Sequence, residues 1–469
     1  MRDKKTLLLI LIIVSLGVHF AYFGHPNETV FDEVHFGKFV NAYHTQEYYF
    51  DIHPPGGKLI IAGFAKPFDF KPDFSFAQIG QKFPDNKYLA LRFLPVLAGA
   101  LLPIVIYLLA LELGFSGLAA FGAGIFVSLE NALLTQSRYI LLDPLLLVFG
   151  FSALLFYLRW RNQKNKWYLL WAGIFSGLAF SIKWTGLTFL GLIIILEMIH
   201  LWEDRRGTAL RRLHAIVASL VIVPALIYFS FFAVHFSLLT KSGEGDAFMT
   251  PAFRRTLSGS AYSSDQSIKP LNLFEKFTEL NMEMFRANKT LTASHPYGSK
   301  WYTWPLMIRP IYYWNASTKL GQVPLESKIY LIGNPFIWWA STVAILYLIL
   351  NILPARMTWS GGHSGFKKSG QEYLVHDTSY LILVGGYALN LLPFIGIPRV
   401  MFLYHYFPSY IFAILALALL IDRQKDKKQI FAIMFLISAA LFIYFAPLSY
   451  GLAVSPSYFK GLIWLPTWQ

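Results

Sequence analysis

The stretch YLALRFLPVLAGALLPIVIYLLAL, residues 88–111, carries one charged side chain, Arg92, among 24 residues. An apolar run of this length crosses a hydrocarbon core of about 30 Å as an α-helix, whose backbone groups are all bonded internally. Comparable runs recur at 6–23, 115–133, 139–158, 167–184, 185–202, 215–239, 328–353, 378–397, 400–421 and 429–448. The sequence therefore predicts an all-α integral membrane protein with about eleven transmembrane helices, within a range of about ten to twelve.

The composition agrees with a membrane protein and explains the positive net charge. Of the 469 residues, 55% are hydrophobic and only 14% are charged, which excludes an ordinary soluble protein. The net charge of +14 could suggest nucleic-acid binding, but basic residues gather in short loops at 2–5, 159–166, 205–212, 356–368 and 423–428. With a cytoplasmic N-terminus, all of these loops lie in the cytoplasm, as the positive-inside rule requires. We therefore expect no nucleic-acid partner.

The N-terminal run is interpreted as a retained span. Residues 1–23 combine a basic start with an apolar run, but no small-x-small cleavage pattern follows before Gly24. The chain contains no cysteine, which excludes disulfides, thiolate metal sites and cysteine nucleophiles. We expect residues 1–469 to form a single multi-pass membrane domain.

Two long connections fall on the predicted non-cytoplasmic side, at 24–87 and 240–327. Long loops in compact proteins are usually functional, and both are expected to fold back over the outer face. The second loop contains apolar residues at helical spacing, which predicts an amphipathic helix on the membrane surface. These residues are Leu273, Phe274, Phe277, Leu280 and Met284.

An adjacent acidic pair, Asp32 and Glu33, follows the first apolar run directly. Neighbouring residues of a helix point about 100° apart, so the two carboxylates cannot hold one small group together and should have different roles. One alternative is purely structural: the pair caps a helix N-terminus and favours its dipole, with Thr29 as another candidate cap.

A second group surrounds the turn Pro54-Pro55-Gly56-Gly57, where Asp51, His53 and Lys58 lie close in sequence. Such a turn can present a lysine and backbone N–H groups to an anion, or it can simply return the chain to the membrane surface. His35 and His53 could bind a metal with Asp32 or Asp51, but compact His-x-x-His spacing is missing. We therefore assign no metal ligands and name no certain cofactor, and the dependence on divalent metal is left open.

Four basic residues lie at predicted outer ends of spans, where the positive-inside rule does not expect them: Arg92, Arg138, Lys183 and Arg399. They either extend toward outer headgroups or form a shared anion site for a phosphate. Arginine binds phosphate well because its planar fork donates two parallel hydrogen bonds.

Aromatic residues and a histidine gather at the end of the second long loop, in SHPYGSKWYTWPL. They are His295, Tyr297, Trp301 and Trp304. Tyr and Trp are common at membrane interfaces in any case, but they would also suit the faces of a sugar or a peptide.

Six stretches resemble, in the same order, the signature sequences of the protein O-mannosyltransferases. They are FDEVHFGKFVNAYHTQEYYFDIHPPGGKL (31–59), LENALLTQSRYILLDPLL (129–146), SIKWTGL (181–187), SHPYGSKWYTWPLMIRPIYYW (294–314), LIGNPFIWW (331–339) and FLYHYFPSYIFAILALALLID (402–422). The resemblance covers nearly the whole chain, and the ordered set is specific to this family.

The resemblance implies a GT-C glycosyltransferase fold and a polyprenyl-phosphate-mannose donor. It also implies transfer of mannose, with inversion, to Ser or Thr hydroxyls of translocating proteins, with the translocon as a possible partner. The family's acidic motif falls on Asp32, as general base, and on Glu33 in a supporting role. Its basic residue in the second span falls on Arg92, and Arg138, Lys183, Arg399 and Lys58 are further candidate phosphate ligands.

The second long loop has no room for the soluble MIR domain of eukaryotic relatives. This points to a short form in a bacterial or archaeal plasma membrane, with the active site on the non-cytoplasmic face. One alternative keeps the fold but changes the sugar, or uses a lipid or glycan acceptor. A more distant alternative is a transporter of an anionic amphiphile, although no internal repeat is evident in the sequence.

Overall fold

A computed structural model describes residues 2–203, 208–291, 293–320, 323–357 and 370–469. Helices occupy all of the predicted apolar runs. They are α1 (Arg2–Phe20), α4 (Tyr88–Glu112), α5 (Gly117–Ser128), α6 (Asn131–Ser137), α7 (Asp143–Gln163), α8 (Lys166–Ile182), α9 (Leu187–Glu203), α10 (Thr208–Val217), α11 (Val223–Leu238), α14 (Pro335–Met357), α15 (Gly370–Leu391), α16 (Phe407–Asp422) and α17 (Lys427–Tyr450). The basic residues predicted at 205–206 and 367–368 lie outside the described residues.

The described helices differ in their ability to span a bilayer. Seven are long and apolar enough to do so, and the bent pair α5 and α6 would make an eighth. The axes of this pair differ by 59°, and the Glu130 carboxylate at the break accepts hydrogen bonds from the N–H groups of Ala132 and Asn334. The chain is thus a multi-pass membrane protein, and the predicted eleven segments are present as helices.

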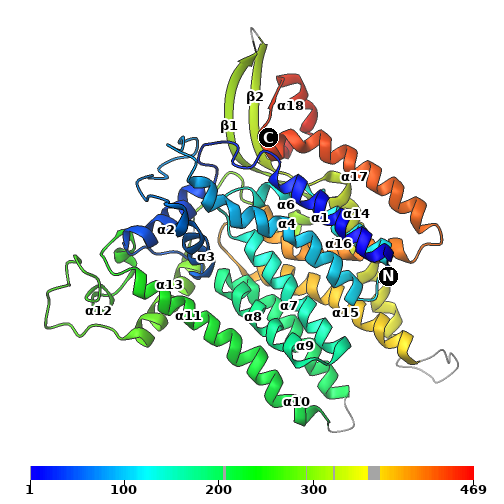
Figure 1. Cartoon of the computed structure of the whole chain (residues 1–469), viewed down its shortest axis with the longest axis horizontal. Helices are drawn as coiled ribbons and strands as arrows, with labels where there is room; N and C mark the ends of the chain where they lie inside the picture. The colour runs from blue at the N-terminus through cyan, green and yellow to red at the C-terminus, as the bar shows by residue number, and fades with distance from the viewer. Residues whose placement is uncertain (1, 204–207, 292, 321–322, 358–369) are drawn as a thin grey trace.

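The described parts of both long loops lie at one end of the bundle, away from the N-terminus (Figure 1). The first contains α2 (Glu33–Thr45) and α3 (Gly56–Ala65), and the second contains α12 (Pro251–Arg254) and α13 (Leu273–Thr290). α13 confirms the predicted amphipathic helix. It begins with a capping box, in which Asn272 and Glu275 each bond the other's backbone N–H.

One element was not predicted from the sequence. Strands β1 (Ile311–Leu320) and β2 (Val323–Leu331) form an antiparallel hairpin that projects from the bundle, and β3 (Ala453–Val454) pairs with β2 (Figure 1). The predicted span at 328–353 therefore begins too early, because β2 runs to Leu331 and α14 starts at Pro335. A short helix, α18 (Pro456–Leu462), follows β3.

Candidate active site

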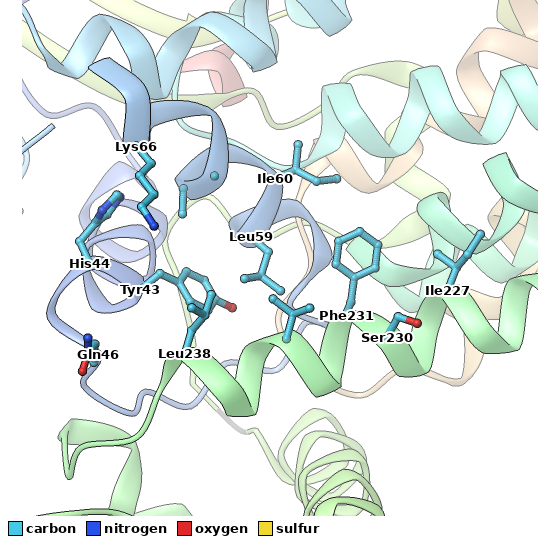
Figure 2. A pocket seen from close by; sticks show the side chains of 13 residues that line it. Tyr43, His44, Gln46, Leu59, Ile60, Lys66, Ile227, Ser230, Phe231 and Leu238 are labelled. Carbon is cyan, nitrogen blue, oxygen red and sulfur yellow. The ribbon is translucent and has the colours of Figure 1, made fainter. Parts of the chain in front are cut away.

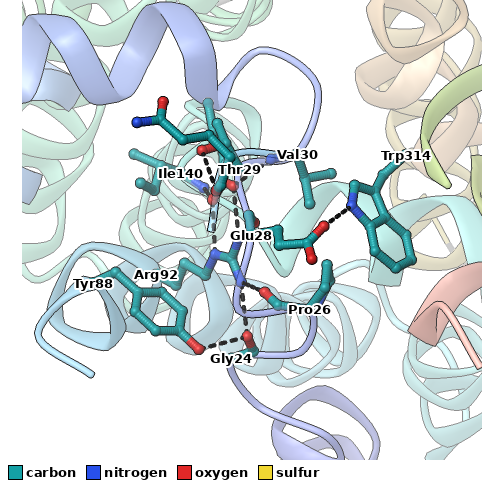
Figure 3. Close-up of polar contacts among 11 residues, drawn as sticks. Gly24, Pro26, Glu28, Thr29, Val30, Tyr88, Arg92, Ile140 and Trp314 are labelled. Atoms are coloured by element: carbon teal, nitrogen blue, oxygen red, sulfur yellow. Dashed lines mark hydrogen bonds and ion pairs between the residues drawn. The ribbon is translucent and has the colours of Figure 1, made fainter. Parts of the chain in front are cut away.

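A buried ion pair ties the first outer loop to the second predicted span. Arg92 on α4 donates from Nε to Glu33 Oε1 at 2.8 Å and from Nη2 to Glu33 Oε2 at 2.7 Å. Its other N–H groups donate to the carbonyl oxygens of Gly24, Pro26 and Glu28 (Figure 3). Both side chains of the pair are fully buried. Arg92 therefore fixes the path of residues 24–33 over the end of α4.

The structure does not support Arg92 as a ligand of the donor phosphate. A guanidinium has five N–H groups, and the bonds of Arg92 use all of them. Glu33 is equally committed, because its carboxylate also accepts from the N–H groups of Val30 and Ile140. Glu33 can hold the loop that carries Asp32, but its buried carboxylate is not accessible to a substrate.

Asp32 differs from Glu33 in its hydrogen bonds and in its exposure. It stands at the N-cap position of α2, yet its side chain makes no capping hydrogen bond. The hydroxyl of Thr29, the other candidate cap, donates to the Gln81 carbonyl instead. Within the described part of the chain, the Asp32 carboxylate is half-buried and forms no hydrogen bond or ion pair. The structure thus leaves this carboxylate available.

The surroundings of Asp32 make it a stronger base than an exposed aspartate. Burial raises the pKa of Asp32 to about 7, and the positive charge of Lys183 opposes this rise. The negative charges of Asp143 and Asp51 raise the same pKa further. A carboxylate whose pKa lies near the working pH has the balance of basicity and ionisation that a general base needs.

The backbone before Asp32 has an unusual conformation. Phe31 has a φ of +45°, which is disfavoured for a bulky residue and must be held by its surroundings. Its ring stacks on Tyr313 of β1, with ring centroids 4.1 Å apart, and its N–H donates to the Tyr313 carbonyl at 3.2 Å. The start of β1 therefore fixes the turn that places Asp32.

A polar chain continues from Tyr313 to Lys183. The Tyr313 hydroxyl donates to Gln136 Oε1, and Gln136 Nε2 donates to Asp143 Oδ2 at 2.7 Å. Lys183, just after α8, donates from Nζ to Asp143 Oδ1 at 2.8 Å. Because Gln136 and Asp143 are each bonded on both sides, this chain fixes the position of the Lys183 charge near Asp32.

The Pro-Pro-Gly-Gly turn is explained by close packing. A Cβ on Gly56 would lie 2.6 Å from the Ser181 carbonyl oxygen, and one on Gly57 would lie 2.9 Å from Leu142 Cδ2. Glycine is thus required for α3 to begin against the end of α8, next to Lys183. Lys58 on α3 forms a buried ion pair with Asp51 and donates to the His53 carbonyl at 2.9 Å. Both of these bonds hold the Lys58 ammonium group within the turn, close to the site.

The remaining cations converge on His53. Burial lowers the pKa of His53 well below its usual value, and the charges of Lys183, Arg399, Lys58 and His405 lower it further. We call these five residues the basic cluster. Arg399 differs from the two lysines because, among the described residues, its half-buried guanidinium forms no hydrogen bond or ion pair. Lys183, Arg399 and Lys58 are thus all close enough to His53 to act on it electrostatically, and their convergence on one phosphate site stays a prediction.

Arg138 lies outside the basic cluster. Its guanidinium donates to the carbonyl oxygens of Ala21 and Tyr22 and packs on the ring of Tyr450, 4.6 Å from the centroid. Arg138 therefore ties the end of α1 to α6 and α17, and the structure does not support it as a phosphate ligand.

The predicted aromatic group separates into two parts. His295 is exposed, and its ring lies 5.1 Å from that of Phe402, which also contacts Phe31. Trp304 is fully buried and stacks on His405, with centroids 5.9 Å apart, so it supports the basic cluster from behind.

The other three predicted substrate-shaping residues have separate surroundings. Tyr297 packs on Arg309, Trp301 packs on Tyr302, and His35 is exposed on α2. No group of three or more His, Asp or Glu side chains in the described ranges is placed to hold a metal ion.

An apolar groove runs beside this site, with a cavity volume of about 570 Å³ (Figure 2). Leu59, Ile60 and Gly63 of α3 form one wall, and Ile227 and Phe231 of α11 belong to the opposite wall. His44, Gln46 and Lys66 lie together at one end, and Ile227 marks the other (Figure 2). α3 connects the two features, because its first turn carries Lys58 and the following turns line the groove.

Comparison with known families accounts for nearly the whole chain. Residues 9–240 match the model of the dolichyl-phosphate-mannose-protein mannosyltransferases, and residues 273–468 match the model of the C-terminal four-transmembrane region of the protein O-mannosyltransferases. The chain belongs to the protein O-mannosyltransferase family. The predicted family resemblance is thereby confirmed.

Protein O-mannosyltransferases of fungi and animals are among its relatives. The chain is 35% identical to dolichyl-phosphate-mannose–protein mannosyltransferase 4 of Candida albicans over 58% of this chain and 38% of that protein. It is 35% identical to protein O-mannosyltransferase 1 of Drosophila melanogaster over 53% of this chain and 30% of that protein. The chain therefore spans about a third of the length of these relatives.

Solved structures place the fold in the GT-C class. The protein O-mannosyltransferase Pmt1–Pmt2 complex of Saccharomyces cerevisiae, bound to its sugar donor, matches with a TM-score of 0.91 over 99% of this chain and 92% of that chain, at 22% identity. The oligosaccharyltransferase of Archaeoglobus fulgidus matches with a TM-score of 0.53 over 98% of this chain and 57% of that chain, at 14% identity. At these identities the likeness shows the fold, and the predicted GT-C fold is confirmed.

Sequence reasoning did not single out several residues of this candidate site. Asp143, Gln136, Tyr313, Phe402 and His405 were all inside the quoted stretches, but none was assigned a role. Asp143 had a usable signal, because an acidic residue at the start of an apolar run is costly unless it has a partner. Tyr313 had none, because the hairpin that carries it was not predicted.

Proposed function

We propose that this protein transfers mannose from a polyprenyl-phosphate-mannose donor to a Ser or Thr hydroxyl of a polypeptide, with Asp32 as general base. The observation that carries the proposal is that the site contains one carboxylate and one guanidinium without bonded partners. Asp32 and Arg399 lack bonded partners among the described residues, whereas the neighbouring Glu33, Lys58, Asp143 and Lys183 are all paired.

In this reaction, Asp32 accepts the proton of the acceptor hydroxyl as its oxygen attacks the anomeric carbon. The new glycosidic bond forms on the face opposite the phosphate, so the anomeric configuration inverts. The bond between the anomeric carbon and the phosphate oxygen breaks, and its electron pair remains on the polyprenyl phosphate. This leaving group is a weakly basic anion that needs electrostatic stabilisation more than a general acid.

The basic cluster supplies this stabilisation. Arg399 has free N–H groups for the phosphate oxygens and can bind them in bidentate fashion. Lys183 contributes its charge from a fixed position, since Asp143 holds it at 2.8 Å. Preorganised charges of this kind stabilise a transition state without reorganisation during the reaction.

The groove between α3 and α11 accommodates the isoprenoid chain of the donor in this proposal. Its lining is mainly apolar, and its residues on α11 recur at Ile227, Phe231, Val234 and Leu238, along one face of a helix that crosses the membrane. The first turn of α3 carries Lys58, a member of the basic cluster, so a lipid in the groove would have its phosphate end near Arg399 and Lys183.

The surroundings of the enzyme follow from the same proposal. The site lies on the non-cytoplasmic face, where a translocated polypeptide meets a donor anchored in the bilayer, and the translocon is a natural partner. The relatives named above are eukaryotic, so the expectation of a bacterial or archaeal membrane stays a prediction.

Purified protein, radiolabelled polyprenyl-phosphate-mannose and a panel of acceptors test the proposal. We expect label on Ser- and Thr-containing peptides and none on their Ala counterparts. Asp32→Asn should remove transfer, and Asp73→Asn, an exposed aspartate in the same loop, should not. Label on lipid or glycan acceptors alone would instead support the alternative transferase.

A further inference from the structure

The hairpin offers an unused hydrogen-bonding edge. β1 is the outer strand of the sheet order β1-β2-β3, and within the described residues its second edge has no strand partner. From Asn315 to Lys319 the side chains are exposed or half-exposed and mostly polar. An unpaired strand edge is a template for another extended chain.

The inner end of this edge lies next to the loop that carries Asp32. Tyr313 interrupts the regular pairing with β2, since Tyr312 is opposite Tyr330 and Trp314 is opposite Ile329. The Tyr313 carbonyl accepts the N–H of Phe31 instead, so the residue before Asp32 already bonds to β1. The Trp314 indole N–H also donates to Glu28 Oε2 at 2.9 Å (Figure 3). Residues 28–31 therefore lie along β1 up to Trp314, and the free edge begins just beyond them.

We propose that the acceptor polypeptide binds by adding a strand to the free edge of β1, from Asn315 to Lys319. This inference rests on the proposed function and specifies how its acceptor is held. An extended chain pairs with the edge through its main-chain groups, and the acceptor residue that continues past the Asn315 end of the edge presents its hydroxyl to Asp32.

The chemistry of the edge favours a polypeptide. Alternating N–H and C=O groups of a strand match the same groups of another peptide chain, whereas a lipid or a glycan has no such repeat. The polar side chains Asn315, Ser317, Thr318 and Lys319 form no apolar surface for a lipid tail. Recognition through the main chain also allows many acceptor sequences, because only the hydroxyl residue needs a fixed identity.

The length of the edge sets the length of acceptor that it can hold. At about 3.3 Å per residue, five residues of β1 extend roughly 17 Å. Acceptor peptides should therefore gain affinity as they are lengthened by about five residues on one side of the hydroxyl residue, and not on the other side.

The test uses the full chain and two families of synthetic peptides. The first is a minimal Ser tripeptide lengthened stepwise at either end, and the second carries single N-methyl groups along the longer peptide. We expect lengthening on one side to lower the acceptor KM by about tenfold, as a few net hydrogen bonds imply. N-methylation should raise KM at alternate positions only, because every second N–H of a strand faces its neighbour.

A shortened hairpin provides the decisive comparison. Replacing residues 318–325 by Asn-Gly keeps the Ser317–Glu326 pair and the contact of β2 with β3. This variant should lose part of the gain from long peptides and retain tripeptide transfer. Leu325→Thr, which changes a side chain of β2 and leaves the free edge of β1 intact, is the matched control and should behave as the original protein.

The outcomes separate this inference from the proposed function. Equal KM values for short and long peptides, or an effect of N-methylation without alternation, would overturn strand addition while peptide transfer itself continued. Binding of a fluorescent Ser→Ala peptide to the intact chain, weakened by the shortened hairpin, would support the edge even if transfer failed. The absence of both binding and transfer would contradict both proposals.

Discussion

The sharpest structural prediction concerns Arg92, which sequence reasoning placed at the donor phosphate and the structure places in a buried bonded network. In Arg92→Lys the charge remains, but three N–H groups replace five, so at least two of the five hydrogen bonds are lost. A hydrogen bond to a charged group contributes about 1.5 to 3 kcal/mol, so the loss of two such bonds costs roughly 3 to 6 kcal/mol. Because folded proteins have only about 5 to 15 kcal/mol of stability, this loss should be evident.

Glu33→Gln tests the other half of the same pair. It leaves a fully buried guanidinium without its counter-charge, and breaking a buried pair in this way costs about 3 to 5 kcal/mol. Thermal unfolding of the purified variants in detergent, followed by tryptophan fluorescence, should show lower melting temperatures for both. The folded fraction should keep the original donor KM.

Arg399→Lys is the matched control for this experiment. Among the described residues Arg399 forms no hydrogen bond, so replacing it with Lys removes none. The melting temperature should therefore stay unchanged while the donor KM rises. The reasoning would be refuted if Arg92→Lys kept the original melting temperature and raised the donor KM, because Arg92 would then be a ligand and not a structural residue.

Two further predictions concern the donor. Arg399→Gln should raise the donor KM by about ten- to a hundredfold, which is the range expected for losing hydrogen bonds to a charged group. Isothermal titration calorimetry of donor binding measures the loss. Gly63→Leu should fill the groove, since a Cβ there meets nothing within 4 Å, and should raise the donor KM by about tenfold if it displaces roughly two CH₂ groups at ~0.8 kcal/mol each. Gly191→Leu on α9, whose Cβ position is equally open, is the control and should leave the KM unchanged. An equal effect of both glycine substitutions would remove the groove from the donor site.

The sequence was sufficient to predict the membrane helices, because length and apolarity are local properties. It was also sufficient to predict different roles for Asp32 and Glu33, because adjacent residues on a helix point in different directions. Local residue chemistry could not say which residue has which role, and only the family resemblance assigned Asp32 as the base. Whether the Glu33 carboxylate forms an ion pair depends on Arg92, which lies 59 residues away in the chain.

The basic residues at span ends show the same limit. Arg92, Arg138, Lys183 and Arg399 all lie at comparable depth in their runs, so the sequence placed them together. Their directions depend on how each helix is rotated and on which loop carbonyls lie nearby. Arg138 meets the carbonyls at the end of α1, and Arg399 meets none of the described groups at hydrogen-bonding distance.

The hairpin was missed for a different reason. Residues 328–331 are apolar enough to merge with the run that follows, and the aromatic residues at 311–314 are also typical of a membrane interface. The strand assignment depends on the pairing of two segments, which no single window of sequence contains.

The most direct test of the central claim is the pH dependence of transfer by the original protein and by Asp32→Asn. The base must be ionised to act, and burial raises the pKa of Asp32 to about 7, so activity should rise about tenfold per pH unit below pH 7 and level off above it. Asp32→Asn should bind the donor normally, lose about 10²- to 10⁴-fold in kcat and lose this pH dependence. A variant that keeps the original kcat, or the original pH profile, would contradict Asp32 as the base.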